Sequence, residues 1–163
     1  MYCADTILGE REPDALRELL ANARDLLRPG GVLLGGIALK KDLEAMRAAC
    51  ADSRGLAAQY NLNLLARINR ELAGDFRVDR FRYRASSAAG DRVEMQLESI
   101  EPQSVHVAGQ AFTFAAGESV RTAVACAYEV EEFRSLAASA GFHPLDAWTD
   151  AEGAFALHAL LAL

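Results

Sequence analysis

The chain has few of the features that define several common classes of protein. Its three cysteines, Cys3, Cys50 and Cys126, are far apart and form no Cys-x-x-Cys pair. An odd number of isolated thiols disfavours a disulfide framework and is typical of reduced cysteines in a cytoplasm. We therefore expect a cytoplasmic protein. Cys50 could be a nucleophile, but no histidine stands near it in the sequence, and we prefer a half-buried helix residue.

Long apolar runs and positive charge are also scarce. The longest apolar run, residues 154–163, is interrupted by His158 and is too short to cross a bilayer. The first residues show no signal-peptide pattern. The chain carries 17 basic and 23 acidic residues, for a net charge of -6. Because no basic stripe is present to neutralise phosphates, neither nucleic acid nor a membrane is expected as a partner.

A glycine-rich turn between a strand and a helix, the usual cradle of a dinucleotide-type cofactor, is also not apparent. The paired glycines at 30–31 and 35–36 do not open a helix after a strand. We interpret the first pair as a turn and the second as a close strand contact. The histidines lack His-x-x-x-His spacing, so no metal site is expected.

What is present is an alternation of helical and strand patterns. With 163 residues, 52% of them hydrophobic, the chain can bury one sizeable core. A nearly continuous apolar run at 32–39 predicts a buried parallel strand. Helical apolar spacing predicts helices at 16–27, 42–50, 56–72 and 130–140, with Gly141 as a left-handed C-cap.

A period of two in the middle of the chain predicts antiparallel strands. Residues 81–85 and 93–97 alternate across a turn at 89–91, and segments 105–107 and 112–114 extend this hairpin toward a small sheet. Two last strands are expected at 143–149 and 154–161. Arg80, Arg82 and Arg84 could form an anion-binding patch or a solvated strand face, and we prefer the second interpretation.

One stretch of sequence is specific enough to indicate a family. Residues 61–72 read NLNLLARINREL and are followed by Gly74, Asp75 and Phe76. This resembles the histidine-specific N-alpha-methyltransferases of ergothioneine biosynthesis, whose sequences carry a helix close to FNLNLLARINRELGADF. Further blocks are similar to the same family in the same order: GVLLGGIALKKD at 31–42, RVEMQL at 92–97, AAGESVRT at 115–122, and the segment 131–150.

The resemblance implies an α/β fold, the C-terminal part of a class I (Rossmann-like) methyltransferase sheet with an inserted α+β substrate-binding lobe. Residues 1–50 and 128–163 would belong to the methyltransferase domain, and 51–127 would form the lobe, a helix with a small antiparallel sheet. S-adenosylmethionine is the implied cofactor, although its main binding motif is missing here. The implied partners are a small amino acid-like substrate and either a second copy of the chain or an N-terminal half.

The resemblance also points to substrate-binding positions, at most of which this chain differs. In the family an Asn meets the substrate ammonium, a Tyr meets the carboxylate, and a Glu and a Ser meet the imidazole. In this chain Glu10 replaces the Asn and Cys50 replaces the Tyr, while Ala123 and Ala125 replace the Glu and the Ser. Tyr60 replaces a pocket Phe, and Met95 is retained.

Loss of these contacts to imidazole predicts altered specificity. Each charge-assisted hydrogen bond contributes ~1.5–3 kcal/mol, so two losses would remove most discrimination for histidine. We expect Ala123 and Ala125 to share a strand face, with Met95 and Tyr60 in reach. No catalytic residue is identified. Two functions remain open: an N-methyltransferase of an amino acid or related small amine, and a noncatalytic remnant or partner subunit that binds no cofactor.

Overall fold

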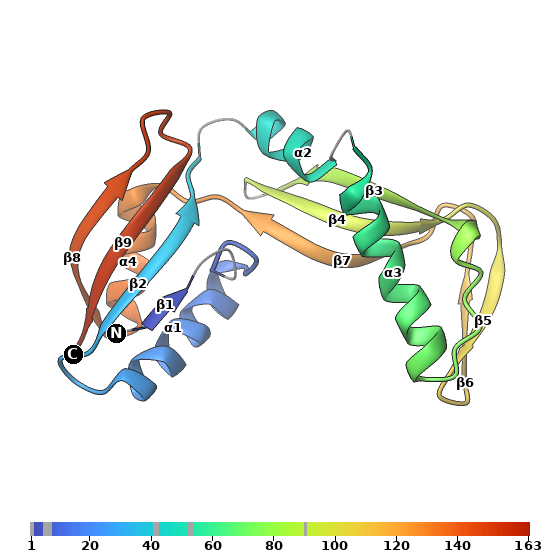
Figure 1. Ribbon diagram of the computed structural model, residues 1–163, viewed down its shortest axis with the longest axis horizontal. Coiled ribbons are helices and arrows are strands. Elements are labelled where there is room, and N and C mark those ends of the chain that lie inside the picture. The colour runs from blue at the N-terminus through green and yellow to red at the C-terminus, as the bar shows by residue number, and fades with distance from the viewer. Residues whose placement is uncertain (1, 5–7, 41–42, 52–53, 90) are drawn as a thin grey trace. The chain divides into compact units, whose positions relative to one another are not determined.

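The computed structural model describes residues 2–4, 8–40, 43–51, 54–89 and 91–163 (Figure 1). The chain divides into two compact units, residues 1–42, 90–92 and 124–163 in the first and residues 43–89 and 93–123 in the second. These limits differ from the expected boundaries at 50 and 128. The main reason is that α2 (Leu43–Ala51) packs against β3 (Phe81–Ala88), so this helix belongs to the second unit.

The first unit is built on a four-stranded sheet with the order β1-β2-β9-β8. Its strands are β1 (Tyr2–Ala4), β2 (Val32–Ala38), β8 (Phe142–Thr149) and β9 (Phe155–Ala162). β2 runs parallel to β1, as its apolar run predicts, but antiparallel to β9, which also pairs antiparallel with β8. β2 and β9 are central strands, as their continuous apolar patterns indicate.

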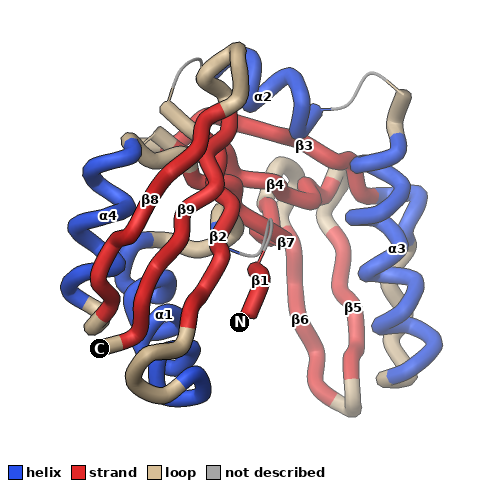
Figure 2. The backbone as a smooth tube through the Cα atoms, turned by 60° about the vertical axis from the view of Figure 1, so that its left-hand side comes forward, coloured by secondary structure: helices blue, strands red, loops and turns tan. Residues whose placement is uncertain are grey.

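Two amphipathic helices pack against each other and against this sheet (Figure 2). They are α1 (Pro13–Leu27) and α4 (Val130–Ser139). α1 begins at a proline that needs no N–H partner there, and it buries Leu16 and Leu20 completely. α4 begins with a capping box between Glu129 and Glu132. Gly141 follows α4 with a φ of 88°, so the predicted left-handed position is confirmed.

The second unit contains a three-stranded sheet with the order β3-β4-β7 and a separate two-stranded sheet, β5-β6. Its remaining elements are α3 (Leu56–Glu71), the short 3-10 helix η2 (Val78–Arg80), β4 (Arg92–Ser99), β5 (Gln103–Val107), β6 (Gln110–Phe114) and β7 (Ser119–Cys126). The expectation that 105–114 extends the first hairpin is wrong, because β7 rather than β5 pairs with β4. A small core of Leu65, Phe81 and Leu97 joins α3 to this sheet.

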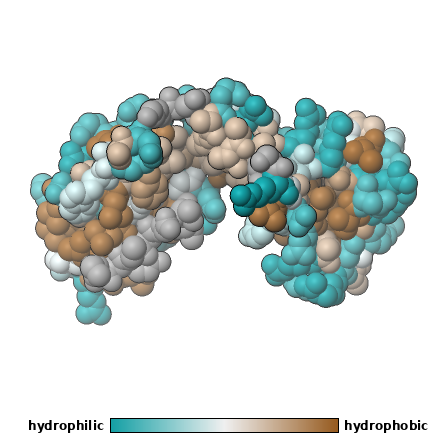
Figure 3. Space-filling view, turned by 45° about the horizontal axis from the view of Figure 1, so that its top comes forward, coloured by the Kyte–Doolittle hydropathy of each residue, from teal (hydrophilic) through white to brown (hydrophobic). Residues whose placement is uncertain are grey.

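Both units keep apolar side chains at the surface, and Figure 3 shows apolar patches on each. In the first unit, Leu145, Trp148 and Phe155 are about half exposed on β8 and β9. In the second, Leu56 and Tyr60 project from α3, and Tyr60 is 81% exposed. Within the described part of the chain, every helix is too short or too polar to cross a membrane.

Candidate functional site

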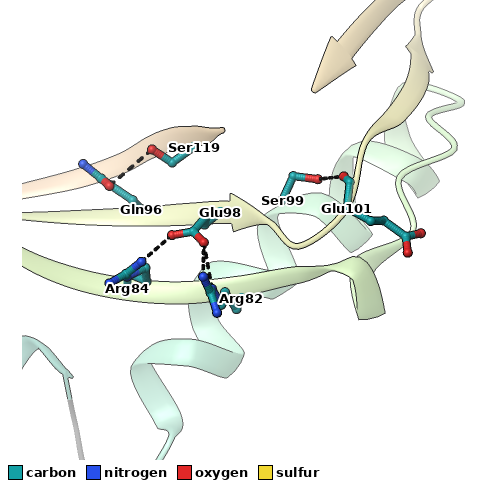
Figure 4. A network of polar contacts seen from close by, with 7 residues as sticks. All are labelled: Arg82, Arg84, Gln96, Glu98, Ser99, Glu101 and Ser119. Atoms are coloured by element: carbon teal, nitrogen blue, oxygen red, sulfur yellow. Dashed lines mark hydrogen bonds and ion pairs between the residues drawn. The ribbon is translucent and has the colours of Figure 1, made fainter. Parts of the chain in front are cut away.

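One face of the three-stranded sheet carries two groups of contacting polar side chains, and we call it the polar face. Side chains alternate along a strand, so this face takes every second residue of each strand. It consists of Arg82 and Arg84 on β3, Glu94, Gln96 and Glu98 on β4, and Ser119 and Arg121 on β7. The contacts of these residues with one another run across all three strands (Figure 4).

Glu98 is the buried centre of the polar face. It is only 6% exposed, and its strand β4 lies between β3 and β7. Its carboxylate accepts a hydrogen bond of 2.9 Å from Arg82 Nε and one of 2.7 Å from Arg84 Nη1. The Arg84 guanidinium, followed by that of Arg82, lowers the pKa of the Glu98 carboxyl. The buried carboxylate is thus kept ionised, and it holds two cationic groups in place.

A second acidic group, Glu94, lies on the same face. Gln96 Nε2 donates to Glu94 Oε2 at 2.9 Å, and Arg121 Nη1 lies 3.2 Å from Glu94 Oε1. Ser119 Oγ donates to Gln96 Oε1 at 3.3 Å. These contacts place the even residues of β4 and the odd residues of β7 on one side of the sheet.

The opposite face is covered by α3 and fixed by a buried amide. Asn61 is 6% exposed and donates from Nδ2 to the Ala57 carbonyl at 2.8 Å. The Thr122 hydroxyl donates to Asn61 Oδ1 and lies 3.0 Å from the Met95 carbonyl oxygen. Asn61 therefore links α3 to β7 from within the helix.

This geometry separates residues that the sequence placed in one pocket. Ala123 follows Arg121 by two residues on β7 and so shares the polar face, whereas Met95 lies between Glu94 and Gln96 and faces the opposite side. Met95 and Ala123 therefore do not share a face of the sheet, contrary to the expectation that Met95 lies in reach of Ala123. Ala125 lies two residues further along β7, in the part that belongs to the first unit.

The other predicted positions lie on helices and in a turn. Cys50 is half-buried in α2, where its carbonyl accepts a 2.8 Å hydrogen bond from the Tyr83 hydroxyl, and burial raises the pKa of its thiol. A raised pKa disfavours the reactive thiolate, which fits a structural role. Tyr60 is exposed on α3. Glu10 is exposed in the turn before α1 and belongs to the first unit.

The paired glycines have packing roles. A Cβ on Gly36 would come within 2.5 Å of the Phe155 ring, and one on Gly35 within 2.7 Å of Leu8. Gly30 adopts a φ of 85° in the turn after α1. Neither pair joins the end of a strand to the start of a helix, so neither forms the backbone cradle of a sulfonium or dinucleotide cofactor.

The fold itself defines a class of protein. An S-adenosylmethionine-dependent methyltransferase from Clostridium acetobutylicum superposes with a TM-score of 0.50 at 11% identity, covering 99% of this chain and 56% of the other. A protein of Pyrococcus horikoshii superposes equally well, with 54% of its chain covered. The chain therefore has a Rossmann-like methyltransferase fold.

Sequence comparison then gives the family. Residues 4–162 match the family model described as histidine-specific methyltransferase, SAM-dependent. The histidine N-alpha-methyltransferase of Mycobacterium tuberculosis is 38% identical over 153 residues, and that of Mycolicibacterium smegmatis is 37% identical. The chain belongs to the histidine-specific methyltransferase family. The alignments cover 92% of this chain and 48% of each relative, so the chain spans about half the length of these relatives.

Proposed function

We propose that this chain is the substrate-recognition part of an N-methyltransferase that uses S-adenosylmethionine to methylate an amino acid or a related small amine. The observation that carries the proposal is the 38% identity to a histidine N-alpha-methyltransferase over nearly the whole chain. The second unit, with α3 and the three-stranded sheet, would be the substrate lobe. The first unit would be part of the methyltransferase sheet.

The methyl donor would be held largely by another segment. The family description names dependence on S-adenosylmethionine, but the paired glycines of this chain fill packing and turn positions. We therefore propose that an N-terminal half, on a separate chain or joined to this one, supplies the cofactor site. The exposed Leu145, Trp148 and Phe155 of the first unit support such a partner, because large apolar side chains at a surface favour association. A homodimer is the competing arrangement.

The substrate is proposed to differ from histidine. Ala123 and Ala125 have neither the charge nor the hydroxyl that would bind an imidazole, and their small size leaves room for a bulkier or more apolar side chain. We propose these two positions as determinants of specificity, while Glu10, Cys50, Tyr60 and Met95 stay predictions. If the substrate is nevertheless histidine, the enzyme would contribute to ergothioneine biosynthesis. The free thiols of Cys50 and Cys126 support a reducing cytoplasm.

A noncatalytic role is the second candidate. It is favoured by one specific observation, the replacement of polar residues at Cys50, Ala123 and Ala125 by residues that give no side-chain oxygen to a substrate. In that case the chain would keep the lobe fold and would bind neither cofactor nor substrate.

The experiment that separates these functions is reconstitution. The chain is purified with the N-terminal half of the Mycobacterium tuberculosis relative, and transfer of a labelled methyl group is measured over a panel of amino acids and their decarboxylated amines. The proposal predicts transfer to at least one member of the panel. The isolated N-terminal half is the control. A folded complex that transfers no methyl group to any member supports the noncatalytic role and overturns the enzyme.

A further inference from the structure

Two arginines of β3 are held in place by one buried carboxylate, and the proposed function assigns them no role. Arg82 and Arg84 stand two residues apart on one strand, and both guanidinium groups contact the same carboxylate, that of Glu98. The carboxylate side chain is 8% exposed, whereas those of the two arginines are 59% and 57% exposed. The anchor is thus buried, and the cations that it holds face solvent.

Most N–H groups of this arginine pair remain available. Arg82 donates to one oxygen of Glu98 and Arg84 to the other. Within the described parts of the chain, Glu98 is the one partner of either guanidinium. A guanidinium has a rigid fork of donors that matches carboxylate and phosphate oxygens. Two forks fixed by one buried anion are therefore prepared for a second oxyanion at little further cost in side-chain entropy.

Neighbouring charges favour the same ligand. Arg121 lies on the same face, so the polar face carries three arginines against the two carboxylates Glu94 and Glu98. This local excess of positive charge occurs in a chain whose net charge is -6. Ser119 and Gln96 add polar groups beside the pair.

We propose that Arg82 and Arg84 form a binding site for a small oxyanion, a carboxylate or phosphate group, on the polar face. Binding at this site is independent of methyl transfer. A failure of the binding test therefore leaves the proposed enzyme untouched, and a failure of the enzyme leaves the binding site untouched. A carboxylate ligand would be that of an amino acid. A phosphate ligand would be free phosphate or a phosphorylated metabolite.

The chain contains a matched pair for comparison. Arg67 and Arg70 of α3 also share one carboxylate, that of Glu71, at 3.2 and 2.9 Å. Glu71, however, has a side chain that is 48% exposed, so solvent competes for it and the arginines are not held. The two pairs have the same charges and differ in the burial of the anchor.

The test is a titration of the purified chain, at constant ionic strength, with inorganic phosphate in one arm and histidine in the other. Binding is followed by the NMR signals of the arginine Nε–H groups. We expect saturable shifts at Arg82 and Arg84 in at least one arm, and an affinity ~10-fold weaker in an R82Q/R84Q variant, as for the loss of a charge-assisted hydrogen bond. The R67Q/R70Q variant should bind like the unmodified chain.

The two titrations distinguish the possible ligands. A second variant separates weaker binding from misfolding. Saturation with histidine alone assigns a carboxylate site, saturation with phosphate alone a phosphate site, and saturation with both a general oxyanion site. An R82K/R84K variant keeps the charge and the fold but lacks the forks, so it too should bind more weakly. Linear, unsaturated shifts in both arms, equal at Arg82, Arg84, Arg67 and Arg70, would overturn the site.

Discussion

His158 is a buried imidazole without a hydrogen-bond partner. It lies on β9, is fully buried, and packs against Phe133 with 4.7 Å between ring centroids. Neither ring nitrogen has a partner among the described residues. Burial, and next the charge of Arg134, lowers the pKa of His158 to about 4. The folded chain therefore stabilises the neutral imidazole over the protonated one.

This lowered pKa predicts an acid-dependent loss of stability. Between an unfolded pKa of about 6.5 and the folded value, the unfolded chain binds more protons, so the free energy of unfolding falls as the pH drops through this window. From pH 7 to pH 4 the loss is about 3 kcal/mol. Substitution of His158→Leu should remove this component, as measured by urea unfolding at several pH values. His143→Leu, at an exposed histidine, is the control. Equal pH profiles for H158L and the unmodified chain would contradict this reasoning.

Glu98 also loses its stabilising contribution as the pH falls, through the lowered pKa of a carboxyl group instead of an imidazole. Its pKa is lowered by Arg84 and Arg82, so its contribution to stability is present above the ordinary carboxyl pKa and is lost as the pH falls through the lowered value. Glu98→Gln should lower the melting temperature at pH 7, because two guanidinium groups lose their anionic partner. Glu71→Gln, at an exposed carboxylate shared by two arginines, should change it little. Similar melting temperatures for E98Q and the unmodified chain would argue against a structural role for the buried charge.

At the scale of elements, α3 is held to the sheet by Asn61 as well as by apolar packing. Asn61→Ala leaves the Thr122 hydroxyl without its amide partner, and we expect a loss of about 1–3 kcal/mol in the free energy of unfolding. Asn63 stands two residues along the same helix and is exposed. Asn63→Ala should therefore stay within about 0.5 kcal/mol of the unmodified chain. Chemical denaturation measures both, and equal effects would show that the Asn61 bridge is not stabilising.

The periodic patterns of the sequence predicted the bounds of helices and strands better than they predicted which strands pair. Apolar spacing placed α3 and the strands of the β3–β4 hairpin within a few residues of their observed bounds, because period and side-chain burial are local properties. The sequence could not show that β7 pairs with β4 while β5 and β6 separate, since pairing depends on contacts between distant segments. For the same reason Glu98 was missed. A glutamate in an alternating strand is typical of a solvated face, and the sequence does not show that Arg82 and Arg84 of the neighbouring strand pack against this one.

The resemblance of residues 61–72 predicted the family and the fold class, and both are confirmed. It could not assemble a site, because the direction of each side chain depends on the register of β4 and β7. Met95 and Ala123 belong to aligned motifs and yet face opposite sides of the sheet. Sequence similarity in two strands thus predicts that the strands are neighbours, but it does not predict which of their side chains share a face of the sheet.

At the scale of the whole molecule, the chain alone should bind S-adenosylmethionine weakly. The paired glycines make no cofactor cradle, so we expect a dissociation constant above ~100 μM by calorimetry. The N-terminal half of the Mycobacterium tuberculosis relative is the control, with tighter binding expected. Low-micromolar binding by the isolated chain would mean that it contains a cofactor site of another kind.

We propose that this chain supplies substrate recognition to a methyltransferase and that positions 123 and 125 set its specificity. The most direct measurement is the ratio of histidine to phenylalanine methylation by the reconstituted enzyme, before and after the double substitution A123E/A125S. We expect the ratio to rise ~10-fold or more, the effect of one restored charge-assisted hydrogen bond. An A111E variant, at an exposed alanine of β6, should leave the ratio unchanged. If the ratio does not change in a folded, active A123E/A125S enzyme, positions 123 and 125 do not set the substrate specificity.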